Sequence, residues 1–260
     1  MSEFIGIRKG RNVLSVIAHV TLNLFLAVGS TALVLVSGSW IMGVLLVVLS
    51  KWRVVAVWPR YWWLNIKANL VDFIVGVSLV MMVYYAGAEL NLAHVVLTMI
   101  YAFWLVAIKP KSSELMAEVQ ALFAVFFGMG AAVLLGANLD PLVLVICSFV
   151  IGYGAARHVL IQSEDHDFSI VTFIFGLLLA QVSFVLYHWL IMYSFGDTGM
   201  MVSQMAIAGS LLALVLFKGY KSALKHDGKI RAGDVAMPVI FSVVIVALMI
   251  MYFSRPIFNV

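Results

Sequence analysis

KWRVVAVWPRYWWLNIKANLVD, residues 51–72, is a basic and aromatic stretch between two apolar runs. Its amphipathic members within 51–67 are Lys51, Trp52, Arg53, Trp58, Arg60, Tyr61, Trp62, Trp63 and Lys67. Aromatic rings with a polar edge and cations on apolar stems are typical of the boundary between membrane and water. We therefore predict that the segment 51–67 lies along the surface of a bilayer, with membrane-crossing helices before and after it.

The composition of the chain also indicates a membrane protein. Of the 260 residues, 64% are hydrophobic and 11% are charged, whereas soluble domains are about half apolar and about a quarter charged. We expect one all-α transmembrane domain over residues 1–260. The net charge of +4 resides in short loops beside apolar runs. This placement favours contact with anionic lipid headgroups on the cytoplasmic leaflet and argues against nucleic-acid binding.

Nine apolar runs are candidates for membrane-crossing helices. They lie at about 13–36, 40–50, 68–86, 91–108, 114–135, 140–158, 168–194, 200–217 and 234–254. A crossing helix needs about 20 residues, so the run at 40–50 crosses only if the residues after it extend the helix. If the N-terminus is inside and all nine runs cross, every one of the 16 Lys and Arg residues except Arg255 falls on the inner side. Because inner loops are enriched in these residues, the sequence predicts nine helices, N-terminus inside and C-terminus outside.

Two short segments of the chain echo each other. Val55–Arg60 (VAVWPR) and Val106–Lys111 (VAIKPK) share the pattern Val-Ala-aliphatic-x-Pro-basic. One interpretation is that helices two to nine are four hairpins of one type, an organisation common in transporters. The alternative is that any membrane-crossing hairpin recurs at about this length.

Asp72 is the acidic residue that we place clearly inside a predicted helix. Asn65 and Asn69 precede it at i, i+4, i+7 spacing, which puts the three side chains on one helical face. An acidic group at membrane depth needs a partner or a functional reason. We expect a pair with Arg157, which follows the small residues of 152–156. Binding of a substrate, or proton coupling, is the other hypothesis for Asp72.

Other polar residues in the apolar runs are candidates for a pathway. Glu118 is predicted to line a cavity near the inner face. His19 and Asn23 share a face of the first helix, and Gln181 and His188 share a face of the seventh. Together they would line a route from the outer face toward the inner carboxylates, or each would form a hydrogen bond between helices.

The sequence contains little that indicates a cofactor or a soluble-type active site. His94 and His188 fall at similar depth, so a haem with two histidine ligands is conceivable, but we predict no cofactor. The acidic loop at 163–167 (SEDHD) lacks zinc-ligand spacing, so we predict no metal site. Walker, GxSxG and HExxH motifs are absent from the sequence, and we predict no catalytic residues.

Four stretches carry a resemblance to a known group of proteins. They are SKWRVVAVWPRYWWLNIKANLVDFIVG (50–76), IKPKS (108–112), GYGAARHVL (152–160) and YHWL (187–190). The chain resembles uncharacterised multi-pass membrane proteins of small-genome, host-dependent bacteria over most of its length. The resemblance implies the cytoplasmic (inner) membrane and, because that family has no assigned activity, no catalytic residues.

Three functions remain open from the sequence. The first is a small-solute, ion or lipid transporter or channel that uses the intramembrane polar residues. The second is a non-catalytic membrane subunit that binds a protein partner or a second copy of the chain. The third is an intramembrane enzyme, in which Arg53, Arg60 and Arg157 hold the phosphate of a lipid-linked substrate while Asp72 or Glu118 acts as a base.

Overall fold

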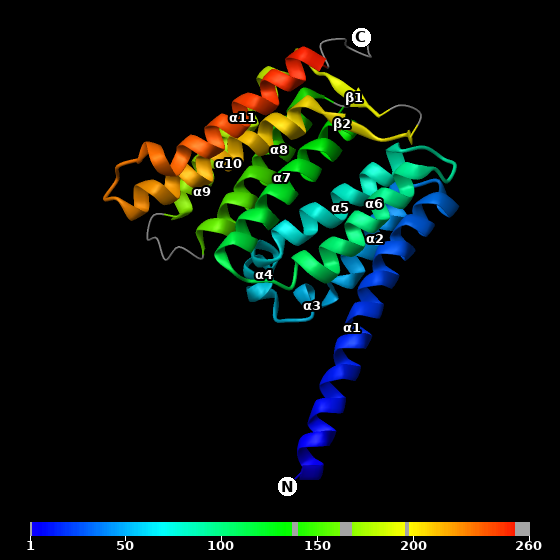
Figure 1. Cartoon of the computed structure of the whole chain (residues 1–260). Coiled ribbons are helices and arrows are strands. Elements are labelled where there is room, and N and C mark those ends of the chain that lie inside the picture. Colours follow the sequence, from blue (N-terminus) through cyan, green and yellow to red (C-terminus); the bar gives the residue numbers. More distant parts are fainter. Residues whose placement is uncertain (1, 137–139, 162–167, 196–197, 253–260) are drawn as a thin grey trace.

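Each of the nine apolar runs forms a helix in the computed structural model (Figure 1), whose described residues are 2–136, 140–161, 168–195 and 198–252. Six helices are long and apolar enough to cross a membrane: α1, from Val13 onward, and α7, α8, α9, α10 and α11. The remaining three runs form the shorter helices α2, α5 and α6. The chain is thus an all-helical, multi-pass membrane protein apart from one small β-hairpin.

The first part of the chain builds one half of the bundle and the interfacial segment. Side-chain caps begin two of its helices: Ser39 accepts a hydrogen bond from the Ile41 N–H at the start of α2, and Asn91 and His94 form a capping box at the start of α6. The elements are α1 (Ser2–Ser37), α2 (Trp40–Ser50), α3 (Trp52–Val55), η1 (Pro59–Tyr61), α4 (Trp62–Ala68), α5 (Leu70–Tyr85), α6 (Leu92–Phe103) and the π-helix η2 (Trp104–Ile108).

The second part of the chain forms the other half. Its helices are α7 (Glu114–Gly136), α8 (Pro141–Leu160), α9 (Phe168–Tyr187), α10 (Gln204–Lys225) and α11 (Ala232–Tyr252). Asp140 caps α8 and Pro141 occupies its first turn, where a missing N–H costs nothing. Small residues allow α8 and α9 to approach closely, because a Cβ on Gly152 would lie 3.1 Å from the Cα of Gly176.

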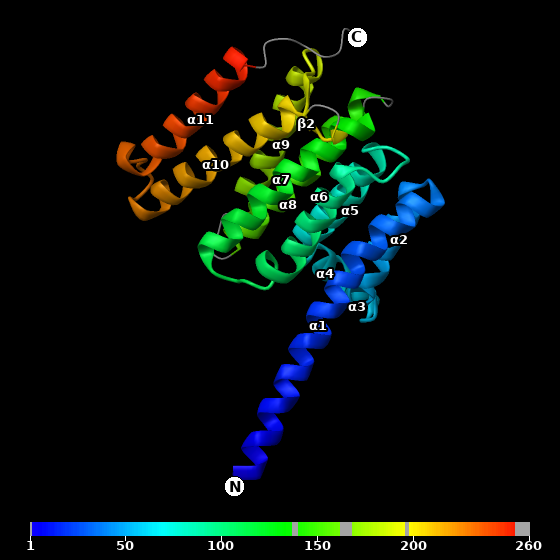
Figure 2. The ribbon, with the colours of Figure 1, turned by 45° about the vertical axis from the view of Figure 1, so that its right-hand side comes forward.

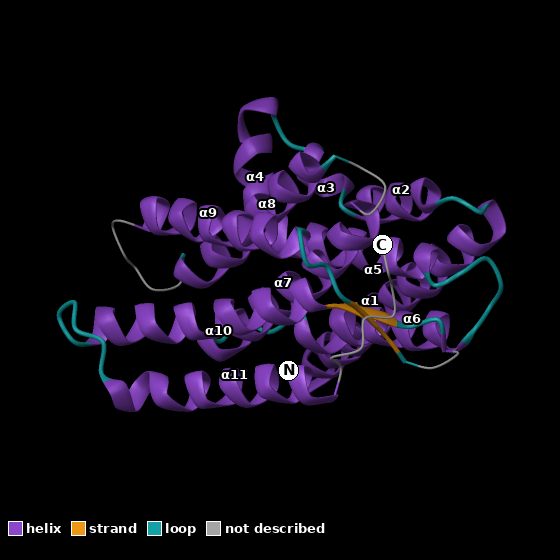
Figure 3. Cartoon of the chain, turned by 90° about the horizontal axis from the view of Figure 1, so that it is seen from above, coloured by secondary structure: helices purple, strands orange, loops and turns teal. Residues whose placement is uncertain are grey.

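Helices α5 and α7 pack together at the centre of the bundle and join its two halves (Figure 2). In the most apolar 18-residue stretch of α7, 67% of the residues are buried. In the corresponding stretch of α11, 6% of the residues are buried. The view from above shows α11 beside α10 at one edge of the molecule (Figure 3). An apolar helix with so little buried surface is compatible with a lipid environment, in which apolar side chains need no protein cover.

Two boundaries predicted from the sequence are wrong. The run predicted to be helical over 168–194 ends as a helix at Tyr187, and β1 (Met192–Ser194) pairs antiparallel with β2 (Met201–Ser203). Ser203 then caps α10 by accepting a hydrogen bond from the Ala206 N–H. α10 continues to Lys225, well beyond the predicted end near 217, because the lysines of its last turns have acidic partners on α7.

Candidate functional site

Asp72 lies in the first turn of α5, where three segments of the chain meet. Its Oδ2 pairs with the Nζ of Lys51, at the end of α2, and with the Nζ of Lys109, which follows η2, at 2.7 Å. Its Oδ1 accepts a hydrogen bond of 3.1 Å from the indole N–H of Trp104. We refer to Asp72, Lys51, Lys109 and Trp104 as the Asp72 cluster. It ties the ends of α2 and η2 to the start of α5.

The prediction that Asp72 pairs with Arg157 is wrong. Arg157 lies in the last turn of α8, and α8 approaches α5 through Gly154, whose neighbours are Leu70 and Ile74. These two residues lie two positions before and after Asp72, on the opposite side of the helix. Asp72 therefore faces α2 and η2. Two lysines that no sequence pattern singled out occupy the expected place of Arg157.

The Asp72 cluster holds two lysines for one carboxylate. Burial and the neighbouring ammonium of Lys109 lower the pKa of Lys51, and burial lowers the pKa of Lys109. The π-helix η2 helps to bring these groups together, since the Lys109 N–H closes its wide turn on the Trp104 carbonyl at 2.8 Å. Single π-turns inside membrane and soluble helices are frequent at functional sites.

Asn65 and Asn69 have a role that differs from the prediction. The helix expected at about 68–86 is broken at Asn69, so that α4 and α5 meet at 67°. The Asn69 side chain donates a 2.9 Å hydrogen bond to the Asn65 carbonyl at the end of α4. The two asparagines therefore stabilise the bend, and they do not share one continuous helical face with Asp72.

The predicted interfacial segment consists of the short helices α3, η1 and α4. Its aromatic rings are exposed, and two of them form cation–π contacts. The Arg60 Cζ lies 4.7 Å from the centre of the Tyr61 ring, and the Lys67 Nζ lies 4.8 Å from the centre of the Trp63 ring. Trp52, Trp58, Trp62 and Trp63 are all exposed. The side chain of Arg53 lies outside the described part of the structure. Exposed rings and cations on a helix bent away from α5 fit a position at the membrane surface.

Glu118 is the acidic residue of a second cluster, between α7 and α10. Its carboxylate oxygens pair with Lys218 at 2.6 Å and with Lys221 at 2.7 Å. Glu114, one turn earlier and largely exposed, lies 3.6 Å from Lys221. Glu118 is buried by these contacts, so the structure gives it ion-pair partners in place of the cavity that the sequence predicted.

We expect the Glu118→Gln variant to lower the free energy of unfolding by about 1–3 kcal/mol. The change removes the charge that both lysines of α10 contact, while leaving the volume of the side chain unchanged. Thermal unfolding in nanodiscs measures the effect. Glu114→Gln, on the same helix but exposed, is the matched control; equal stability of the two variants would contradict the assignment.

Gln120 and His158 form a contact that the sequence did not suggest. The Gln120 amide donates to the carbonyls of Ile108 and Lys111, both at 2.8 Å, and its oxygen lies 2.6 Å from His158 Nε2. Carbonyl groups that end η2 have no partner within the helix, and Gln120 provides one. The sequence feature that could have indicated this contact is the presence of a glutamine within the apolar run that forms α7.

The predicted outer pathway is not assembled in the structure. His19 and Asn23 contact each other at 3.2 Å, and the Asn23 amide reaches the Leu105 carbonyl of η2 at 3.4 Å. Gln181 and His188 are exposed on and just beyond α9, in the other half of the bundle (Figure 1). The two pairs therefore lie apart, and neither leads to Asp72.

The two histidines considered as haem ligands also lie in different settings. His94 is fully buried in the first turn of α6, where its ring nitrogens contact Asn91 at 2.7 Å and the Gly87 carbonyl at 3.2 Å. His188 is exposed and its Nδ1 lies 2.9 Å from the Phe184 carbonyl. These contacts make His94 part of the cap that begins α6.

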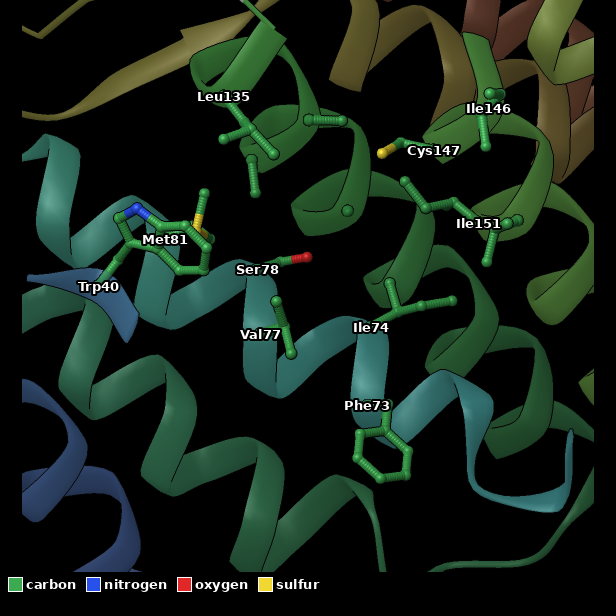
Figure 4. A pocket seen from close by; sticks show the side chains of 14 residues that line it. Trp40, Phe73, Ile74, Val77, Ser78, Met81, Leu135, Ile146, Cys147 and Ile151 are labelled. Carbon is green, nitrogen blue, oxygen red and sulfur yellow. The ribbon is translucent and has the colours of Figure 1, made fainter. Parts of the chain in front are cut away.

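An apolar pocket of about 350 Å³ lies between α5, α7 and α8 (Figure 4). Ile74 and Met81 of α5, small residues of α7 and Ile151 of α8 form its walls. Ile146 and Val150 at its rim are 53% and 40% exposed, so the pocket opens on the side of the bundle. We refer to it as the lateral groove. A second apolar pocket of about 400 Å³ lies between α6 and α7.

Neither pocket is lined by a charged side chain. In the described ranges, no three His, Cys, Asp or Glu side chains are placed to share a metal ion; the acidic loop at 163–167 lies outside those ranges. Comparisons with protein-family models, curated proteins and solved structures give no match.

Proposed function

We propose that the protein is a lipid transporter or carrier of the bacterial cytoplasmic membrane that takes one hydrocarbon chain into the lateral groove. The groove carries this proposal, because it is apolar, has the volume of a small-molecule site and opens where lipid chains lie. Of the solutes considered from the sequence, a lipid suits it best. A small polar solute or an ion needs polar groups along its path, and the strongest candidates for such groups, Asp72 and Glu118, are each paired with two lysines.

The proposal includes nine passes through the membrane, with the N-terminus inside. The pass of α2 is short, because this helix ends at Ser50 and the residues after it do not extend it, as the sequence prediction had required. The ion pairs support this orientation. They place the ends of α2, η2 and α10 beside the starts of α5 and α7, so the cations at these positions gather at one end of the bundle. Enrichment of Lys and Arg at one end is typical of the cytoplasmic side.

Photo-crosslinking tests the groove. The protein is placed in phosphatidylcholine nanodiscs that contain a diazirine-labelled phosphatidylcholine, and modified residues are mapped by peptide mass spectrometry. We expect several-fold more modification at groove residues, such as Cys147 and Val77, than at Val243 on the exposed face of α11. A lipid held in the groove stays longer beside these residues than a freely exchanging lipid stays beside α11.

A pair of alanine substitutions provides the control for this experiment. Ala132→Phe fills the groove that Ala132 lines and should abolish the excess labelling. Ala247→Phe adds the same bulk on the exposed surface of α11 and should leave it intact. Labelling that simply follows the exposure of each residue would rule out a lipid site in the groove.

A non-catalytic membrane subunit is the second candidate, and the exposed helices favour it. α11 packs against α10 and has only 6% of its apolar stretch buried, and residues 13–19 of α1 extend away from the bundle with their apolar side chains exposed. A protein partner or a second copy of the chain would cover these surfaces. In that case, crosslinking would show low lipid labelling of α11 in the native membrane. The intramembrane enzyme is the least supported function, because each of its candidate bases, Asp72 and Glu118, is paired with two lysines.

A further inference from the structure

The Asp72 cluster contains more lysines than carboxylates. Lys51 and Lys109 pair with the same carboxylate oxygen, and within the described residues Asp72 is the acidic side chain that either lysine contacts. An ammonium group has three N–H donors, and the shared oxygen can engage only one of them on each lysine. Burial and the nearness of the second ammonium group disfavour the charged form of Lys51, and an anion beside the two lysines would favour it.

The position of the cluster makes it accessible to such an anion. Lys51 is buried, but the Lys109 side chain is 36% exposed. Trp52, directly after Lys51, is 60% exposed and belongs to the interfacial segment. Exposed tryptophans lie at the level of lipid headgroups, so the open side of the cluster faces the layer in which phosphate groups are found.

We propose that the Asp72 cluster binds a phosphate group through Lys109, with Lys51 behind it. Lysine is a common phosphate ligand, acting as a point charge. The phosphate has two possible sources, the headgroup of an anionic phospholipid and free inorganic phosphate. The site is separate from the lateral groove, because Asp72 lies on the side of α5 opposite to Ile74, which lines the groove. The two proposals can therefore fail independently.

The test for lipid compares two lysines of one loop. Lys109→Gln removes a lysine of the cluster, and Lys111→Gln removes an exposed lysine two residues later. Both variants, and the wild type, are extracted from nanodiscs of phosphatidylcholine with phosphatidylglycerol, and the retained lipids are counted by native mass spectrometry. We expect the wild type to retain more phosphatidylglycerol than phosphatidylcholine. In Lys109→Gln the ratio of retained phosphatidylglycerol to phosphatidylcholine should fall about five-fold, and in Lys111→Gln it should stay at the wild-type value.

Lys109→Gln should fold, since it leaves a balanced pair of Lys51 and Asp72. Lys109→Arg, which keeps the charge, should retain most of the preference. For free phosphate, wild type and Lys109→Gln are heated in nanodiscs of phosphatidylcholine alone, in phosphate or in chloride of equal ionic strength. A phosphate-dependent rise in the unfolding temperature of the wild type, absent from Lys109→Gln, would identify the free anion as ligand. No response in either experiment, or equal losses in Lys109→Gln and Lys111→Gln, would overturn the proposal.

Discussion

Replacing Asp72 by Asn should lower the free energy of unfolding by about 3–5 kcal/mol, the usual effect of removing one partner from a buried ion pair. Asp72 and Lys51 are each 8% exposed, so the lysine left behind has little water to replace the lost carboxylate. The amide retains the shape of the side chain and can still accept from Trp104. The measurement is thermal or denaturant unfolding in nanodiscs, followed by tryptophan fluorescence.

Two further variants separate the buried ion pair from a general effect of charge. Glu89→Gln removes an acidic residue that is exposed between α5 and α6 and should be neutral. Adding Lys51→Gln to Asp72→Asn removes the stranded buried ammonium and should recover part of the lost stability. If Asp72→Asn unfolds like the wild type, the cluster does not stabilise the fold.

Gly152→Val should destabilise the protein by about 3 kcal/mol, because it forces two tightly packed helices apart. A Cβ at position 152 would lie 2.8 Å from the Leu179 Cδ1 and 3.1 Å from the Cα of Gly176. The Leu179 side chain can rotate, but the backbone of α9 at Gly176 cannot yield without moving the helix. Unfolding of the purified variant measures the effect, and expression in the membrane should fall with it.

The control for Gly152→Val is the same substitution at Gly233. Gly233 lies in the first turn of α11, and no atom stands within 4 Å of the position of its Cβ. Gly233→Val therefore makes the same change of side chain, which slightly favours the helix by propensity, without a collision. Equal destabilisation by the two variants would show that the substitution itself, and not the contact between α8 and α9, determines the effect.

The sequence predicted the helices well, because hydropathy and turn residues act locally. All nine runs are helical, and Pro141 and the capping residues lie where the helices begin. The bend at Asn69 was missed, since an asparagine in a polar stretch is compatible both with a continuous helix and with a break. The hairpin of β1 and β2 was missed because its short strands continue the hydropathy of the helices beside them.

The partners of the polar residues were much harder to predict. Spacing along one helix gives the direction of Asp72, but the identity of the cation that meets it depends on which helices are neighbours. Arg157 was chosen because α8 carries small residues, and α8 does pack on α5, at Gly154. It packs on the other side of α5. The π-helix η2 positions Lys109 beside Asp72, and no sequence pattern in residues 104–108 predicts a π-helix there.

The break at Asn69 shortens the buried centre of the bundle. It limits α5 to 16 residues, about 24 Å of helix, whereas the 23 residues of α7 measure about 34 Å. A hydrocarbon layer is about 30 Å thick, so α5 is shorter than the layer and α7 is long enough. No residue of α5 is exposed, so its neighbouring helices, and not a thinner bilayer, accommodate the short helix.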